Sequence, residues 1–199
     1  MIPAIVLAAG KSSRMGRPKA LLPIGASGDT FLTRILRELR SGGIDRVIVV
    51  LGGSADAIRA SLPANDPSIS IVDNPHYEQG QLSSLIVGLN AADTPGVDAV
   101  MVTLVDLPLI TASTVRAVLD AHTRTPAAPL VRPRRGQRHG HPAIFHRALF
   151  DELRNADPSH GAKPVVHAHA AEEVHVDVAD DGPFTDIDTP ADYDRWISG

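Results

Sequence analysis

The chain contains no cysteine. This absence excludes a disulfide framework and any metal site that is built on thiolates. A catalytic metal ion in this protein must therefore be held by oxygen or imidazole ligands. A chain without cysteine is also typical of a reducing compartment, so we expect a cytoplasmic protein.

Aromatic residues are scarce, and there is no excess of basic residues. Aromatic side chains make up 4% of the sequence, and the formal net charge is −4 at pH 7. Surfaces that bind duplex nucleic acid usually carry excess Lys and Arg, and surfaces that bind single strands use aromatic rings as stacking platforms. We therefore expect no nucleic-acid partner.

Long hydrophobic runs are absent as well. No apolar run approaches the roughly 20 residues that a membrane-spanning helix needs. The apolar N-terminal stretch, residues 1–9, is short, lacks a basic region and leads directly into Gly10 and Lys11, which is not the pattern of a signal peptide. We expect a buried strand there and no membrane partner.

Short apolar runs alternate with longer amphipathic segments over the first 125 residues. The runs are nearly free of polar residues, as in strands buried on both faces of a parallel sheet; they cover residues 4–7, 46–51, 69–72 and 99–105. The segments between them have helical spacing and cover residues 30–41, 54–62, 81–92 and 111–123. The alternation predicts an α/β fold.

The pattern becomes irregular after residue 125. Residues 125–129 read as a turn, and residues 132–141 read as a loop rich in Gly, Arg and His. Helices are predicted to resume at residues 146–155, 161–169 and 191–197. The length of 199 residues is typical of one domain, so we interpret the break at 125 as a boundary between two parts of a single domain.

A glycine-containing loop directly follows the first predicted strand and reads LAAGKSSRMGRPK over residues 7–19. Small residues let the backbone approach a ligand closely, and successive N–H groups in such a turn can hold an anion. Arg14 and Lys19 add positive charge to it. The loop therefore favours phosphate binding over the alternative of a plain tight turn.

Two common nucleotide motifs are excluded at this loop. A Walker A loop would need glycine where Ile5 stands, inside the predicted strand. A dinucleotide-binding GxGxxG is absent too, because the next glycine after Gly10 is Gly16. The loop belongs to neither type.

Acidic residues form two separate candidate metal-binding positions. Asp106 follows a buried strand, at the edge of the sheet where ligands of α/β folds bind, and its carboxylate suits Mg²⁺; the alternative is a turn cap. Asp186 and Asp188 would face one side of an extended segment, with Ile187 buried on the other. We predict Asp106, Asp186 and Asp188 as ligands of one or two metal ions.

Four further residues are candidates for substrate contact. Ser83 and Ser84 lie near a helix start and could donate to a base or a phosphate, or they could simply cap the helix. His141 stands between Gly140 and Pro142 in the basic loop, and with Lys163 it is a candidate for binding an anionic acceptor.

The nine histidines do not indicate a zinc site. His167 and His169 are two residues apart on a predicted helix, so they do not share a face.

Together these motifs resemble the molybdenum cofactor cytidylyltransferase and guanylyltransferase group of nucleotidyltransferases. The resemblance covers nearly the whole chain and is carried by the glycine loop, by LVDLP at residues 104–108, by GHP at residues 140–142 and by DIDTP at residues 186–190. It implies a Rossmann-like three-layer fold with a mixed, mostly parallel sheet. With the break in pattern at residue 125, we expect a nucleotide-binding half at about residues 1–125 and an acceptor-binding part at about residues 126–199.

The resemblance implies the roles of individual residues and of Mg²⁺. Arg14, Lys19 and Asp106 are expected to be catalytic. The expected nucleotide contacts are Leu7, Ala8, Ala9, Gly10, Arg14, Lys19, Ser83, Ser84 and Asp106. The expected metal is Mg²⁺, and His141 and Lys163 are expected to contact the acceptor.

The expected reaction is transfer of a nucleoside monophosphate from an NTP to a small phosphorylated acceptor such as molybdopterin, with a transient partner protein that could receive the product. Ala9 favours CTP, because the guanylyltransferase branch usually has LAGG where this chain has LAAG. Leu82 stands where a glycine is frequent, which leaves base and acceptor open. The alternatives are GTP or another acceptor such as phospholactate or a sugar phosphate, a P-loop kinase, and a non-enzymatic nucleotide-binding protein.

Overall fold

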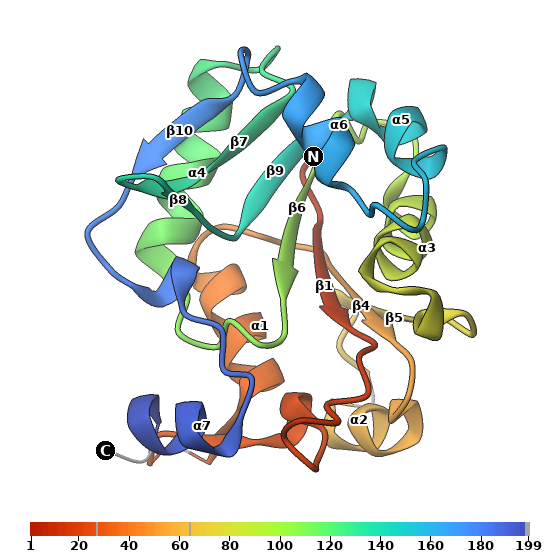
Figure 1. The fold of residues 1–199 in the computed structure, drawn as a ribbon, viewed down its shortest axis with the longest axis vertical. Helices are drawn as coiled ribbons and strands as arrows, with labels where there is room; N and C mark the ends of the chain where they lie inside the picture. Colours follow the sequence, from red (N-terminus) through yellow and green to blue (C-terminus); the bar gives the residue numbers. More distant parts are fainter. Residues whose placement is uncertain (27, 64, 198–199) are drawn as a thin grey trace.

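A mixed sheet forms the centre of the protein in a computed structural model that describes residues 1–26, 28–63 and 65–197 (Figure 1). In the described residues the strand order is β10-β7-β9-β6-β1-β4-β5, and β8 pairs with β7. The strands are β1 Ala4–Ala8, β4 Val47–Leu51, β5 Ile69–Asp73, β6 Ala99–Leu104, β7 Leu130–Arg135, β8 Arg138–His139, β9 Ala143–His146 and β10 Val174–Asp177. A small separate ribbon pairs β2 Pro23–Ile24 with β3 Asp29–Thr30.

Most neighbouring strands are parallel. β1 pairs in parallel with β4 and β6, and β4 with β5, so the carboxyl ends of these four strands meet at one edge. β9 runs antiparallel to both β6 and β7, while β10 is parallel to β7. The sheet thus joins strands from both parts of the chain.

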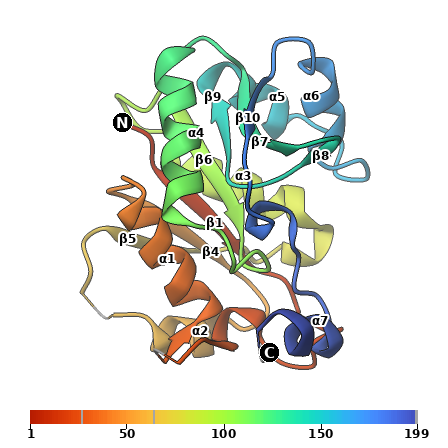
Figure 2. The same ribbon diagram turned by 90° about the vertical axis from the view of Figure 1, so that its left-hand side faces the viewer.

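Helices cover both faces of the sheet (Figure 2). Ala4 and Val6 of β1 pack in one apolar cluster with α1 and α4, whereas Ile5 and Leu7 pack on the opposite face with α3 and α5. The helices are α1 Phe31–Ser41, α2 Ala55–Ser61, α3 Gln81–Ala92, α4 Ala112–Arg124, α5 Phe150–Arg154, α6 Lys163–Ala168 and α7 Pro190–Trp196. The predicted Rossmann-like three-layer fold is confirmed.

The ends of α1 follow from local sequence. The Thr30 hydroxyl accepts the Thr33 N–H at 3.3 Å, and the Thr33 hydroxyl accepts the Thr30 N–H at 2.7 Å, which forms a capping box. Gly42 ends the helix, as predicted. The apolar residues of α1 are all buried. Leu32, Ile35, Leu36 and Leu39 pack against the sheet, whereas Phe31 packs in a separate cluster with Met15.

The part of the sheet formed after residue 125 corrects one prediction and includes a strand, β10, that was not predicted. Residues 132–135 belong to β7 and 138–139 to β8, so the predicted loop is wrong there. β10 was not predicted at all. Both strands carry charged residues that pair across the sheet: Arg134 of β7 lies 3.0 Å from Asp177 of β10. In the sequence alone the pairing is not visible, so these charged residues look like those of a solvent-exposed loop.

A close approach of α3 to β1 depends on Gly88. A Cβ atom at Gly88 would lie 2.5 Å from Cγ2 of Ile5 and 3.2 Å from Cγ2 of Val50. We therefore expect Gly88→Ala to lower the free energy of unfolding by up to about 2 kcal/mol, because an overpacking cost of about 1–3 kcal/mol outweighs the helix-propensity gain of about 1 kcal/mol. Urea denaturation measures the change. An equal loss in an Ile5→Ala background, which lacks the contacting methyl, would contradict this explanation.

The segment after β10 returns to the glycine loop. Thr189 caps α7 with Asp192, and Pro190 takes the first helical position, as predicted. The Tyr193 hydroxyl donates to the Pro23 carbonyl at 2.8 Å. Ile187 is fully buried with Met15 and other apolar residues near the loop, namely Leu22, Ile24 and Phe31. This packing places residues 186–188 beside the start of the chain. No helix in the described ranges combines the length and the apolar character that crossing a membrane requires.

Candidate active site

The glycine loop turns sharply after β1 and presents backbone N–H groups. Ser12 has a positive φ of 52°, and its carbonyl accepts the N–H groups of Met15 and Gly16, both at 3.0 Å. Its hydroxyl accepts the Lys19 N–H at 3.0 Å. Within the described ranges, the N–H groups of residues 10–14 donate to no protein acceptor. Free donors in such a turn form a site for an anion.

Lys19 joins the two acidic positions. Its ammonium nitrogen lies 3.3 Å from Oδ2 of Asp106 and donates a hydrogen bond to Oδ1 of Asp188. Arg14 contacts the other Asp188 oxygen, with 2.8 Å between Nη1 and Oδ2. Only 9% of Lys19 is exposed. The carboxylates of Asp106 and Asp188, distant in sequence, therefore meet beside the glycine loop.

Asp106 has the features of a metal ligand. The Ile187 N–H donates to its backbone carbonyl at 2.8 Å, which holds the C-terminal segment against the end of β6. Its side-chain Oδ1 is buried and has no hydrogen-bond partner in the structure. A buried carboxylate oxygen without a donor is costly, and a divalent cation would satisfy it. The oxygen-only donor set also suits Mg²⁺.

Asp186 and Asp188 alternate with Ile187 as predicted, but their environments differ. Burial works to raise the pKa of Asp188, yet the hydrogen bond and charge of Lys19, and then Arg14, outweigh it and the pKa is lowered. The pKa of Asp186 is raised by partial desolvation and then by the negative charges of Asp106 and Asp188, although the side chain keeps contact with solvent. Asp186 and Arg138 line a neighbouring depression, which shares Arg14 and Asp188 with the cavity at the glycine loop.

A cavity of about 330 Å³ lies between the glycine loop, α3 and the end of β6. Asp188 lines it as well. The predicted nucleotide-binding residues that line it are Leu7, Ala8, Ala9, Gly10, Arg14, Lys19, Ser84 and Asp106. The structure thus brings these residues around one space, whereas Ser83 and Asp186 are not among those that line it.

Ser83 and Ser84 have different surroundings. The Ser83 hydroxyl donates to backbone carbonyls, at 2.8 Å to Gly80 and 3.0 Å to His76, so it holds the turn before α3. Ser84 is 4% exposed and lines the cavity. The buried Asn74 amide donates to both hydroxyls, at 2.8 and 2.9 Å. Sequence reasoning missed this role of Asn74; a polar residue directly after a strand was the available signal.

A second cavity, of about 550 Å³, adjoins the first and shares Leu7, Gln81 and Leu104 with it. His141 and Lys163 both line it, as do the basic or titratable side chains Arg132, His139, His160 and His167. Apolar residues, including Leu85 and Phe145, line the rest. The two residues predicted for the acceptor therefore share one cavity next to the cavity at the glycine loop.

Gly140 and Pro142 fix the backbone on either side of His141. A Cβ atom at Gly140 would lie 2.3 Å from the Pro183 carbonyl oxygen, so only glycine fits there. The His141 N–H donates to the same carbonyl at 3.1 Å, and the His141–Pro142 peptide bond is cis. Burial, and to a lesser extent the charge of Arg132, lowers the pKa of His141 to about 4. His141 is therefore neutral at pH 7.

The lowered pKa of His141 predicts a pH dependence of stability. The unfolded chain takes up a proton near pH 6.5, while the folded chain resists it until about pH 4. The free energy of unfolding therefore falls as the pH drops through this window, by about 3 kcal/mol from this group. Urea titrations across that pH range should show a shallower decline for His141→Asn. His76 is exposed, so His76→Asn should show the same pH dependence of unfolding free energy as the wild type. If His141→Asn also shows the wild-type pH dependence, the prediction is contradicted.

The family is shown by comparison with known proteins. A model of the MobA-like NTP transferase domain matches residues 4–174. The chain belongs to this family. The predicted resemblance is thereby confirmed, and the protein is a MobA-like nucleotidyltransferase. The matched region contains the glycine loop and Asp106, whereas Asp186 and Asp188 lie beyond it.

Curated relatives of this MobA-like chain carry different names. A probable molybdenum cofactor guanylyltransferase of Rhodopirellula baltica is 29% identical and covers 77% of this chain and 79% of its own. The molybdenum cofactor cytidylyltransferase of Escherichia coli K12 is 27% identical, and the match covers 96% of this chain and 93% of that protein. The nicotine blue oxidoreductase of Paenarthrobacter nicotinovorans is 30% identical, and the match covers 94% of this chain and 92% of that protein. These names do not decide between CTP and GTP.

Solved structures agree with the fold. A crystal structure of Rv0371c from Mycobacterium tuberculosis H37Rv has a TM-score of 0.82 and 33% identity, covering 100% of this chain and 99% of its own. A second structure of Rv0371c is described as a complex with manganese, with a TM-score of 0.75, 32% identity and coverage of 100% and 98%. A divalent metal is thus associated with a structural relative.

Proposed function

We propose that this protein transfers a nucleoside monophosphate, with CMP favoured, from an NTP to a small phosphorylated acceptor such as molybdopterin, releasing pyrophosphate. The observation that carries the proposal is the contact of Lys19 with both Asp106 and Asp188, beside the free N–H groups of the glycine loop. Cations, carboxylates and free backbone donors in one cavity are what the triphosphate of an NTP with its metal requires.

In the proposed reaction an oxygen of the acceptor phosphate attacks the α-phosphorus of the NTP. A new P–O bond forms as the bond to the bridging oxygen breaks, and pyrophosphate leaves with the electron pair. The nucleophile is already an anion, so no general base is needed. The obstacle is repulsion between two anions, and Arg14 and Lys19 reduce it by placing positive charge beside the phosphates.

Asp106 and Asp188 would hold Mg²⁺, with Asp186 as a further ligand in our proposal. When bound, the ion would neutralise phosphate charge and polarise the phosphate oxygens. The orphaned Oδ1 of Asp106 supports this assignment. The manganese complex of Rv0371c is consistent with a divalent ion, and the choice of Mg²⁺ rests on the donor set.

The second cavity is the proposed acceptor site. It adjoins the nucleotide cavity, so an acceptor there would lie next to the α-phosphate. Lys163 supplies positive charge for an anionic group, and neutral His141 supplies a hydrogen bond, whereas the charge of Arg132 is paired with Glu173. The apolar wall suits a ring system better than an open polyol. These features favour a phosphorylated heterocycle such as molybdopterin over a sugar phosphate.

Ala9 supports CTP as the donor. It lines the nucleotide cavity in the LAAG sequence that is typical of the cytidylyltransferase branch. Leu82 lines the second cavity and departs from the glycine that is frequent at that position. GTP is therefore the alternative donor, in keeping with the guanylyltransferase names among the relatives.

The test is a matrix of four NTPs against several acceptors, with Mg²⁺ present and pyrophosphate release measured. We expect turnover with CTP and molybdopterin, and little with sugar phosphates or phospholactate. Turnover with GTP alone would overturn the CMP assignment but keep the reaction class. NTP binding without pyrophosphate release for any acceptor, or release of γ-phosphate, would overturn nucleotidyl transfer itself.

A further inference from the structure

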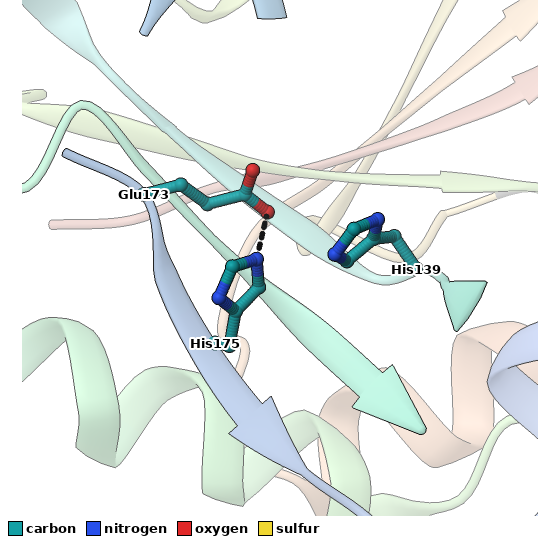
Figure 3. Close-up of side chains that lie close together, drawn as sticks. All are labelled: His139, Glu173 and His175. Carbon is teal, nitrogen blue, oxygen red and sulfur yellow. Dashed lines mark ion pairs between the residues drawn. The ribbon is translucent and has the colours of Figure 1, made fainter. Parts of the chain in front are cut away.

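Two histidines and a glutamate converge outside the nucleotide cavity (Figure 3). His139 comes from β8, His175 from β10, and Glu173 directly precedes β10. β8 and β10 both pair with β7, which brings residues far apart in sequence to the same edge of the sheet. One ligand atom from each of the three side chains lies within 4.8 Å of the others.

The cluster contains a buried carboxylate and an unsatisfied imidazole. The Glu173 side chain is only 2% exposed. Nε2 of His175 lies 3.2 Å from Oε1 of Glu173, yet this nitrogen is buried and has no hydrogen-bond partner in the structure. The His139 ring stacks on that of His175, with 4.8 Å between the ring centroids. A buried imidazole nitrogen beside a carboxylate oxygen suits coordination of a cation.

We propose that His139, Glu173 and His175 form a binding site for one late first-row transition-metal ion, with Zn²⁺ as the representative. Two imidazoles and one carboxylate are a donor set for Zn²⁺, Co²⁺ or Ni²⁺, whereas Mg²⁺ selects oxygen ligands. Three protein ligands leave a coordination position for water or a bound molecule. Because His139 lines the second cavity, the ion would lie at the wall of that cavity.

The geometry needs one modest adjustment. Ligand atoms around a tetrahedral zinc ion with bonds of about 2.1 Å are about 3.4 Å apart. Glu173 and His175 already have this separation. His139 is exposed on the short strand β8, next to the turn at Gly136, so its ring can tilt out of the stack and close the remaining gap of about an ångström.

Arg132 supports the carboxylate and sets a limit on affinity. Its guanidinium contacts both oxygens of Glu173, including a hydrogen bond of 2.9 Å from Nη2 to Oε2. A ligating carboxylate is commonly held this way by a further donor, which fixes its orientation. The positive charge of Arg132 also repels a cation, so we expect micromolar rather than picomolar binding. Without metal, Arg132 neutralises the buried Glu173.

The experiment is a Zn²⁺ titration of the purified protein by calorimetry. An Asp106→Asn and Asp188→Asn double variant serves as the background, so that the carboxylates of the nucleotide cavity do not contribute. We expect one Zn²⁺ per chain, with binding at least about tenfold weaker in His139→Ala and in His175→Ala, because even residues that only support metal ligands contribute that much. The exposed His76→Ala is the matched control and should bind like the background.

His139→Ala keeps the test free of folding effects, since its side chain is exposed. Thermal unfolding of that variant without metal should match the background, while added Zn²⁺ should raise Tm in the background and not in the variant. Replacing Zn²⁺ with Co²⁺ should give visible absorption typical of a tetrahedral site. Equal Zn²⁺ affinity in the background and in His139→Ala, or no Zn²⁺ binding at all, would overturn the proposal. Nucleotidyl transfer is not needed for any of these readouts, so the two proposals can fail separately.

Discussion

Replacing Asp106 with asparagine is expected to lower kcat/KM for pyrophosphate release by about a hundredfold or more, which is on the order of 3 kcal/mol of transition-state stabilisation. The reason is the loss of a negative ligand at the end of β6, where the side-chain Oδ1 is buried without a donor. Asparagine keeps the shape of the side chain, so the fold should survive. Steady-state kinetics with CTP, molybdopterin and Mg²⁺ measure the effect.

Asp120→Asn is the matched control for this change. Asp120 is exposed on α4, and the same loss of charge there should leave turnover within about twofold of the wild type. Metal affinity is the second readout: Asp106→Asn should bind Mn²⁺ more weakly, because a ligand is lost. Near-normal turnover in Asp106→Asn would show that the metal assignment is wrong.

Lys19→Met is expected to lower turnover to a similar extent while keeping, or even strengthening, metal binding. Lys19 supplies a nearly buried positive charge beside the phosphates, and methionine keeps its length without the charge. Removing the ammonium also frees the oxygens of Asp106 and Asp188 that it contacts, so a divalent ion meets less competition. Kinetics and Mn²⁺ titration together separate this variant from Asp106→Asn, which should lose both properties.

Stability provides a further check on Lys19→Met. Without metal, two carboxylates lose their shared cation, so Tm should fall; added Mg²⁺ should restore much of it. Lys19→Arg should restore little activity, because a guanidinium is broader and distributes its charge differently from a compact ammonium. Loss of metal binding in Lys19→Met would contradict the proposed separation of roles.

The centre of the fold was predictable because its strands are buried on both faces. Continuous apolar runs such as those at residues 46–51 and 99–105 leave few alternatives to parallel strands with helices between them. The edge strands were less predictable. β7 and β10 carry Arg132, Arg134 and Asp177, and these residues read as a polar loop until their partners across the sheet are known.

The candidate site was predictable as a set of residues but not as an arrangement. Lys19 contacts Asp106 across 87 residues and Asp188 across 169, and no local pattern encodes such a meeting. It follows from the sheet order and from the burial of Ile187, which are tertiary properties. The same limit explains why a search for histidines on one helix face missed His139 and His175, which two different strands bring together.

The C-terminal segment has few buried residues of its own, and this has a consequence for its dynamics. No residue of α7 is buried, and the segment is held by Ile187, by the contacts of Asp188 with Lys19 and Arg14, and by Tyr193, which stacks on Phe31 and donates to the Pro23 carbonyl. Its local opening should therefore cost less free energy than global unfolding. Because opening dismantles the nucleotide cavity, bound NTP and metal should slow amide hydrogen exchange over residues 184–197 far more than in the central strands.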